Sequence, residues 1–176
     1  MMPLQPNYTM KGRSAVKLLD QVAQWHDVLA RENRQPSGSW APSGIAELNW
    51  RDETSGLRWH IDELLTSKAL NYEGRQMHHC VASYAGNCRR GSKSVWSMQA
   101  EDKAGTRVRV VTIAVHNPSH NIVEVRGKYN AQAKRSAKNP QNQAFEKLYR
   151  ELLAQSGRVM RRWMEQEGLG RTNRSY

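Results

Sequence analysis

Two adjacent residues, His79 and Cys80, are the side chains of this sequence best suited to nucleophilic catalysis. A cysteine thiolate is a strong nucleophile, and a nearby histidine or cation favours that ionised form. Tyr84, four residues further on, supplies a hydroxyl that can donate or accept a proton. His79, Cys80 and Tyr84 are therefore the candidate catalytic residues. Alternatively, Cys80 is a buried core residue that packs against its neighbours and does not react.

The second interpretation comes from the spacing of the apolar residues around Cys80. Met77, Cys80, Val81, Tyr84 and Cys88 recur at intervals of three and four residues, which predicts a helix over residues 73–90. In such a helix the two cysteines would lie about 12 Å apart, too far for a disulfide. Their spacing is also not that of a zinc motif. We expect no metal and no cofactor.

Two stretches of the chain carry positive charge and no acidic residue. The whole chain has 27 Lys and Arg against 16 Asp and Glu, for a formal net charge of +11. Residues 74–100 include four Lys or Arg, and residues 125–145 include five. Such clustering is the electrostatic footprint of a surface that contacts phosphates, so DNA or RNA is the expected partner.

The candidate nucleic-acid-binding residues combine these cations with one aromatic ring that can stack on a base and one amide. They are Arg75, Arg89, Arg90, Lys93, Arg126, Lys128, Tyr129, Asn130, Lys134, Arg135 and Lys138.

Hydrophobic periodicity predicts the elements that position these residues. We expect helices over residues 14–33, 57–68 and 73–90, and strands over residues 94–98, 106–115 and 122–126. A last helix begins at Pro140, with a buried stripe of Phe145, Leu148, Tyr149, Leu152 and Leu153. The fold class is α+β: a small antiparallel β-sheet packed by helices, with helical N- and C-terminal segments.

The length of 176 residues is typical of a single domain. Within it we distinguish an N-terminal helix and loop (1–56), a core (57–131), and a basic loop followed by C-terminal helices (132–176). No apolar run approaches the roughly 18 residues of a membrane span, and the first residues do not form a secretory signal. We therefore expect a cytoplasmic protein without a membrane partner.

The segment from Glu73 to Tyr84 reads EGRQMHHCVASY. It resembles the core of the PcfJ-like family of plasmid- and phage-borne proteins, approximately E-G-x-x-M-x-H-C-V-x-x-Y. The segment from Arg126 to Asn130, RGKYN, resembles the R-G-K-x-N element of the same family. The likeness covers residues 57–131. The chain departs from the pattern at Ala114, where the family more often has Glu, and at Glu124, where it more often has Gln.

The resemblance implies an accessory protein of a mobile element and supplies no established reaction. With the charge pattern, it predicts a basic nucleic-acid-binding accessory protein of a plasmid or phage. One alternative is an enzyme centred on His79, Cys80 and Tyr84, such as a nuclease or a thiol-dependent transferase or hydrolase. Another is an interaction module that binds an acidic protein or a ribonucleoprotein complex.

Overall fold

A computed structural model describes residues 38–128 and 143–172 of the chain. The chain divides into two compact units, residues 1–38 and 39–176, and the second unit contains all the helices and strands that the structure describes. The helix predicted over residues 14–33 lies outside the described residues.

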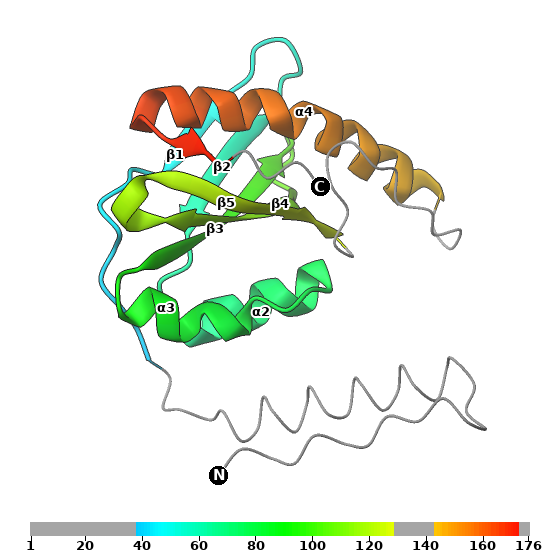
Figure 1. Cartoon of the computed structure of the whole chain (residues 1–176). Helices are drawn as coiled ribbons and strands as arrows, with labels where there is room; N and C mark the ends of the chain where they lie inside the picture. The colour runs from blue at the N-terminus through cyan, green and yellow to red at the C-terminus, as the bar shows by residue number, and fades with distance from the viewer. Residues whose placement is uncertain (1–37, 129–142, 173–176) are drawn as a thin grey trace, which may run out of the picture. The chain divides into compact units, whose positions relative to one another are not determined.

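The sheet has six strands in the order of the sequence (Figure 1). They are β1 (Leu48–Arg51), β2 (Arg58–Glu63), β3 (Lys93–Glu101), β4 (Arg107–His116), β5 (Asn121–Gly127) and β6 (Gly170–Arg171). The first five strands form an antiparallel meander, whereas β6 pairs with β5 in parallel, so the sheet is mixed rather than purely antiparallel. The three strands predicted from β-branched composition are present as β3, β4 and β5.

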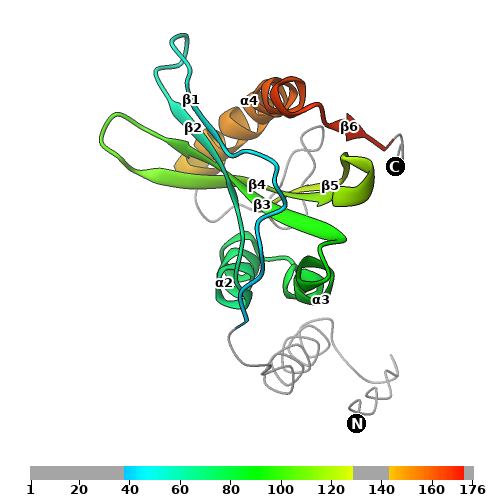
Figure 2. The same cartoon turned by 90° about the vertical axis from the view of Figure 1, so that its left-hand side faces the viewer.

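Three helices of the described ranges pack on this sheet. They are α2 (Ser67–Met77), α3 (Ala85–Arg89) and α4 (Gln143–Glu167). A short 3-10 turn, η1 (Ala82–Tyr84), lies between α2 and α3, and another, η2 (Asn117–Ser119), lies between β4 and β5. Figures 1 and 2 show α4 on one side of the sheet and α2 with α3 on the other. The fold is therefore α+β, with the sheet between two helical layers. Among the described residues, no helix is long and apolar enough to cross a membrane.

The side of the sheet under α4 is the main hydrophobic core. Trp59, Ile61, Trp96 and Met98 point to this side and are fully buried. Trp163 of α4 packs on Trp96 with ring centroids 4.9 Å apart. Since alternate residues of a strand face opposite sides, the intervening residues lie on the other face. We call these two sides the apolar face and the polar face.

The polar face carries hydrogen-bonding side chains across neighbouring strands. Strand pairing places Asp62, Ser97, Thr112 and Arg126 in one row, and His60 beside Gln99 in the next. Ser97 and Thr112 are buried. The helices α2 and α3 cover part of this face, so polar side chains lie between them and the sheet.

The helix predicted over residues 57–68 is wrong, because most of that segment is the strand β2. Trp59 and Ile61 are buried against the apolar face, while Arg58, His60 and Asp62 alternate with them on the polar face. This period of two is that of a strand. The preceding strand β1 was not predicted, since its four residues are too few to display a period.

The predicted stripe of the last helix is correct only in part. Tyr149, Leu152 and Leu153 are buried, whereas Phe145 and Leu148 are exposed. The first turns of α4 extend beyond the edge of the sheet, so nothing in the sheet covers that end (Figure 1). Pro140, the predicted start, lies outside the described residues.

Candidate functional site

The continuous helix predicted over residues 73–90 is wrong, because α2 ends at Met77. His78 adopts the left-handed conformation (φ 53°, ψ 45°), and its N–H donates to the carbonyl of Gly74. A left-handed residue after the last turn is a common way to end a helix. His79 and Cys80 therefore lie in a loop that leads to η1, and Cys80 leaves the buried stripe and is exposed.

This loop folds back onto the last turns of α2. The N–H of His79 also donates to the carbonyl of Gly74, at 3.2 Å. A Cβ atom at position 74 would stand only 2.9 Å from the carbonyl oxygen of His79. Because that neighbour is backbone, the loop would have to shift to admit a side chain. A glycine at position 74 thus permits the close approach that fixes His79 beside the helix.

Glu73 fastens the same helix to the sheet. Its carboxylate is fully buried and accepts hydrogen bonds from Arg109 Nε at 2.8 Å and from Thr112 Oγ1 at 2.7 Å. A buried carboxylate is tolerated where a cation and a hydroxyl satisfy it. The Arg109 guanidinium also lies over the ring of Tyr72, 4.8 Å from its centroid. Glu73 therefore sets where α2, and the loop that follows it, stand on β4.

Tyr84 connects η1 to the last antiparallel strand. Its hydroxyl donates a short hydrogen bond of 2.5 Å to one carboxylate oxygen of Glu124, and Arg126 Nε is paired with the other oxygen. Lys93 Nζ lies 4.9 Å from the centroid of the Tyr84 ring. Burial, together with the bond to Glu124, raises the pKa of Tyr84 to about 12. Tyr84 is therefore a neutral hydrogen-bond donor at physiological pH.

The imidazole of His79 lies close to this cluster and has no partner. Both ring nitrogens are buried, and neither makes a hydrogen bond. Burial lowers the pKa of His79, and the positive charge of Arg126 lowers it further. The ring is thus neutral at pH 7, with one N–H and one lone pair unused. Buried polar groups without partners are uncommon in native proteins, and they concentrate where a protein has a task besides folding.

The two cysteines have different surroundings. Cys80 is exposed in the loop and lies near Tyr84. Cys88 is buried beside Leu70 and Val95, and burial raises the pKa of its thiol to about 11. Both thiols are free. Within residues 38–128 and 143–172, no three His, Cys, Asp or Glu side chains are grouped as a metal site requires.

The structure brings together only part of the predicted nucleic-acid-binding set. Lys93 and Arg126 adjoin the Tyr84–Glu124 pair, and Lys128 directly follows β5. The exposed Arg75 lies on α2, and Arg89 and Arg90, also exposed, end α3. The remaining predicted residues lie outside the described ranges: Tyr129, Asn130, Lys134, Arg135 and Lys138.

The two positions at which the sequence differs from the family pattern lie next to each other in the structure. Ala114 on β4 and Glu124 on β5 are direct cross-strand partners, so their side chains point to the same face. Position 114, where the pattern has a carboxylate, is an alanine in this chain. The neighbouring position 124 carries a carboxylate instead, that of Glu124. The sequence marks Glu124 only as a departure, and no local signal reveals its contacts with Tyr84 and Arg126.

Three residues of the two family-like segments, His79, Tyr84 and Arg126, therefore lie in one cluster. The sequence profile described as PcfJ-like protein matches residues 19–142, more than half of the chain. The chain belongs to the PcfJ-like protein family. In this PcfJ-like protein the matched region includes all of β1–β5, α2 and α3. Comparison with curated proteins and with solved structures gave no match.

Proposed function

We propose that this PcfJ-like protein is a nucleic-acid-binding accessory protein of a mobile genetic element, a plasmid or a phage. It contacts phosphates through Lys93 and Arg126, which lie around His79 and Tyr84, and through Lys128 at the end of β5; we call these residues the β5 surface. The observation that carries the proposal is the meeting of the two acid-free segments. Residues 74–100 and 125–145 are far apart in the sequence, yet Tyr84, Lys93, His79 and Arg126 lie in one cluster.

The charge balance of this cluster supports the proposal. Its carboxylate, Glu124, is already paired with Arg126 and bonded to Tyr84. Lys93, beside the Tyr84 ring, adds a positive charge that this carboxylate does not balance. Phosphate groups are attracted to such an excess, and each contact releases bound counterions, which makes the affinity depend on salt.

The end of β5 is held in place by contacts with α4. The backbone N–H of Lys128 donates to the hydroxyl of Tyr149 at 2.5 Å, and this hydroxyl donates to the carbonyl of Val110 at 2.8 Å. The Lys128 ammonium lies 5.1 Å from the centroid of the Phe145 ring. Lys128 is therefore held in place at the end of β5, two residues after Arg126.

The test is a salt titration of binding to labelled single- and double-stranded DNA and RNA. The double variant Arg126→Ala/Lys128→Ala should bind all of them more weakly. The slope of log affinity against log salt should fall by about 1.4 for single strands and about 1.8 for duplexes, since two phosphate contacts are lost. The matched control, Arg161→Ala/Arg171→Ala, removes two exposed arginines of α4 and β6. Equal affinity and slope in both variants would contradict the proposal.

A variant of Glu124 tests whether the charge of the cluster controls the affinity for nucleic acid. Glu124→Gln removes the negative charge of the cluster and keeps an oxygen that can accept from Tyr84. It should strengthen binding, by a factor that shrinks as the salt concentration rises. A loss of affinity in this variant, with the fold intact by circular dichroism, would mean that Glu124 serves binding in another way.

A second candidate function is an enzyme that uses His79 with Cys80 and Tyr84. It is favoured by one observation, the neutral imidazole without a partner next to an exposed thiol. A nucleophilic thiolate at position 80 should be alkylated in the folded protein much faster than a free cysteine at pH 6. Cys88, which is buried, serves as the internal control for unfolding. Alkylation of Cys80 at or below the rate of a free thiol would count against a thiol-dependent enzyme.

A further inference from the structure

Two exposed arginines face each other at the outer edge of the polar face. Arg51 on β1 and Arg58 on β2 are direct cross-strand partners, so their side chains leave the sheet on the same side. Like charges in this position destabilise a sheet. Neither guanidinium has an acidic partner among the described residues. The two guanidinium groups repel each other, although Glu101 lies opposite Arg58 on β3, and an anion bound between the two would relieve this repulsion.

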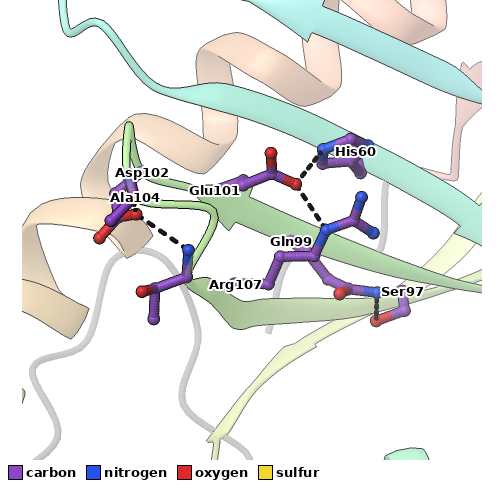
Figure 3. A network of polar contacts seen from close by, with 8 residues as sticks. His60, Ser97, Gln99, Glu101, Asp102, Ala104 and Arg107 are labelled. Carbon is purple, nitrogen blue, oxygen red and sulfur yellow. Dashed lines mark hydrogen bonds and ion pairs between the residues drawn. The ribbon is translucent and has the colours of Figure 1, made fainter.

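The next strands add Glu101 and a third arginine, Arg107, to the same corner. Arg58 lies opposite Glu101 on β3, and Glu101 lies opposite Arg107 on β4. Figure 3 shows Glu101 between His60 and Arg107: it accepts from His60 Nε2 at 3.1 Å and from Arg107 Nε at 2.6 Å. The hydrogen bond from Arg107 lowers the pKa of Glu101, which stays ionised and fixes both partners.

Arg109 lies two residues after Arg107 on β4 and contacts an aromatic ring, that of Tyr72, beside this corner. Its guanidinium is held by the buried Glu73 and stacks on Tyr72 of α2. Tyr72 as a residue is 51% exposed, which makes it one of the exposed large hydrophobic residues of the described ranges. A cation fixed beneath an exposed aromatic ring gives a rigid platform on which a base can stack.

We propose that this corner, formed by Arg51, Arg58, Arg107 and Tyr72, binds single-stranded nucleic acid. We call it the arginine corner. The arginines contact successive phosphates, and Tyr72 stacks on an unpaired base. A duplex offers the phosphates but not the face of a base, because its bases are stacked on one another. The inference rests on the proposed nucleic-acid-binding function and names its substrate class.

The position of the arginine corner suits a strand that also reaches the β5 surface. Arg126 lies on the same face of the sheet, in the row that includes Thr112 and Ser97. Four strand spacings separate β1 from β5, or about 19 Å. A single strand that passes along the outside of α2, which lies on β4 between the two surfaces, can therefore contact both.

The experiment measures the binding of labelled single strands of roughly 16 nucleotides, and of duplexes of equal length, by fluorescence anisotropy. Arg51→Ala/Arg58→Ala should lower the salt slope for single strands by about 1.4 and weaken binding about tenfold at low salt. The control is again Arg161→Ala/Arg171→Ala, whose arginines lie on α4 and β6. The arginine corner is refuted if the two double variants bind alike.

Tyr72→Ala tests the stacking separately from the charge. It should weaken single-strand binding about fivefold or more, leave the salt slope unchanged and barely alter duplex binding, while Tyr72→Phe should bind like the wild type. Equal losses for single strands and duplexes would overturn the single-strand assignment. If Arg126→Ala/Lys128→Ala weakens binding and the corner variants do not, the proposed function stands and the arginine corner fails. Absence of any binding by the wild-type chain would overturn both.

Discussion

The two faces of the sheet differ in what fills them. Under α4 the apolar face is packed with aromatic and aliphatic side chains, among them Trp59, Trp96 and Trp163. Under α2 the polar face holds a buried carboxylate, hydroxyls and guanidinium groups that bond to one another. Hydrophobic burial stabilises a fold without regard to direction, whereas buried polar groups must be placed accurately. The apolar face therefore supplies most of the stability, and the polar face supplies the positions of chemical groups.

The comparison extends to the buried polar atoms that have no partner. In the described ranges these are Nε1 of Trp59, Oε1 of Gln155 and both ring nitrogens of His79. Trp59 belongs to the apolar core and Gln155 lies on α4, so only His79 stands on the side of α2. There it adjoins Arg126 and Glu124. Other polar side chains on this face make hydrogen bonds, so an imidazole without one indicates a role in binding or chemistry rather than in stability.

The largest expected effect is on the apolar face. Trp163→Ala removes a fully buried ring that packs on Trp96, and it should lower the free energy of unfolding by about 3–5 kcal/mol. Trp163→Phe keeps a ring and loses the hydrogen bond from Nε1 to the carbonyl of Ala46, so about 1 kcal/mol is expected. Urea unfolding measures both. A cost of under 1 kcal/mol for Trp163→Ala would show that this face is not the main source of stability.

A smaller effect is expected from the main buried carboxylate of the polar face. Glu73→Gln keeps the shape of the side chain but weakens its bonds with Arg109 and Thr112, at a cost of about 1.5–3 kcal/mol. The matched change Glu146→Gln affects an ion pair with Arg150 on the surface of α4 and should cost under about 0.5 kcal/mol. The same unfolding measurement applies. Similar costs for the two variants would remove the distinction between an anchoring and a surface carboxylate.

The smallest effect is a dependence of stability on pH. The pKa of His79 is lowered in the folded protein from an ordinary value of 6.5, so the unfolded chain takes up its proton first as the pH falls. The contribution of His79 to stability therefore falls as the pH drops through about 6.5. His79→Gln should lose less stability than the wild type between pH 7 and pH 5. The measurement is urea unfolding at each pH, and equal losses of stability in His79→Gln and the wild type would contradict this role of His79.

The strands and the motif cluster could be predicted from the sequence to different extents. The β-branched residues of β4 and the turn after His116 determine the meander from β3 to β5, because strand propensity and turn chemistry agree there. The segment over residues 57–68 is ambiguous, since Trp59 and Ile61 fit a helical stripe as well as an alternating strand. Only the pairing of β2 with β3, a long-range contact, decides between them.

The candidate site was predictable in its residues and not in its geometry. Residue spacing singles out His79, Cys80 and Tyr84, but it places all three on one helix. The left-handed His78 breaks that helix, and a non-glycine residue rarely adopts this conformation, so its type gives no warning. The contact of Tyr84 with Glu124 spans 40 residues, and the arginine corner depends on β1 and β2, which the sequence does not reveal as strands.

The central claim is that nucleic acid binds to the polar side of the sheet. Hydrogen–deuterium exchange with and without a single-stranded oligonucleotide tests it most directly, because bound segments become protected. We expect protection in residues 78–93, in β5 and in the turn between β1 and β2, with little change along α4. Protection confined to α4, or no protection at an oligonucleotide concentration far above that needed for polyanion binding at low salt, would contradict the claim.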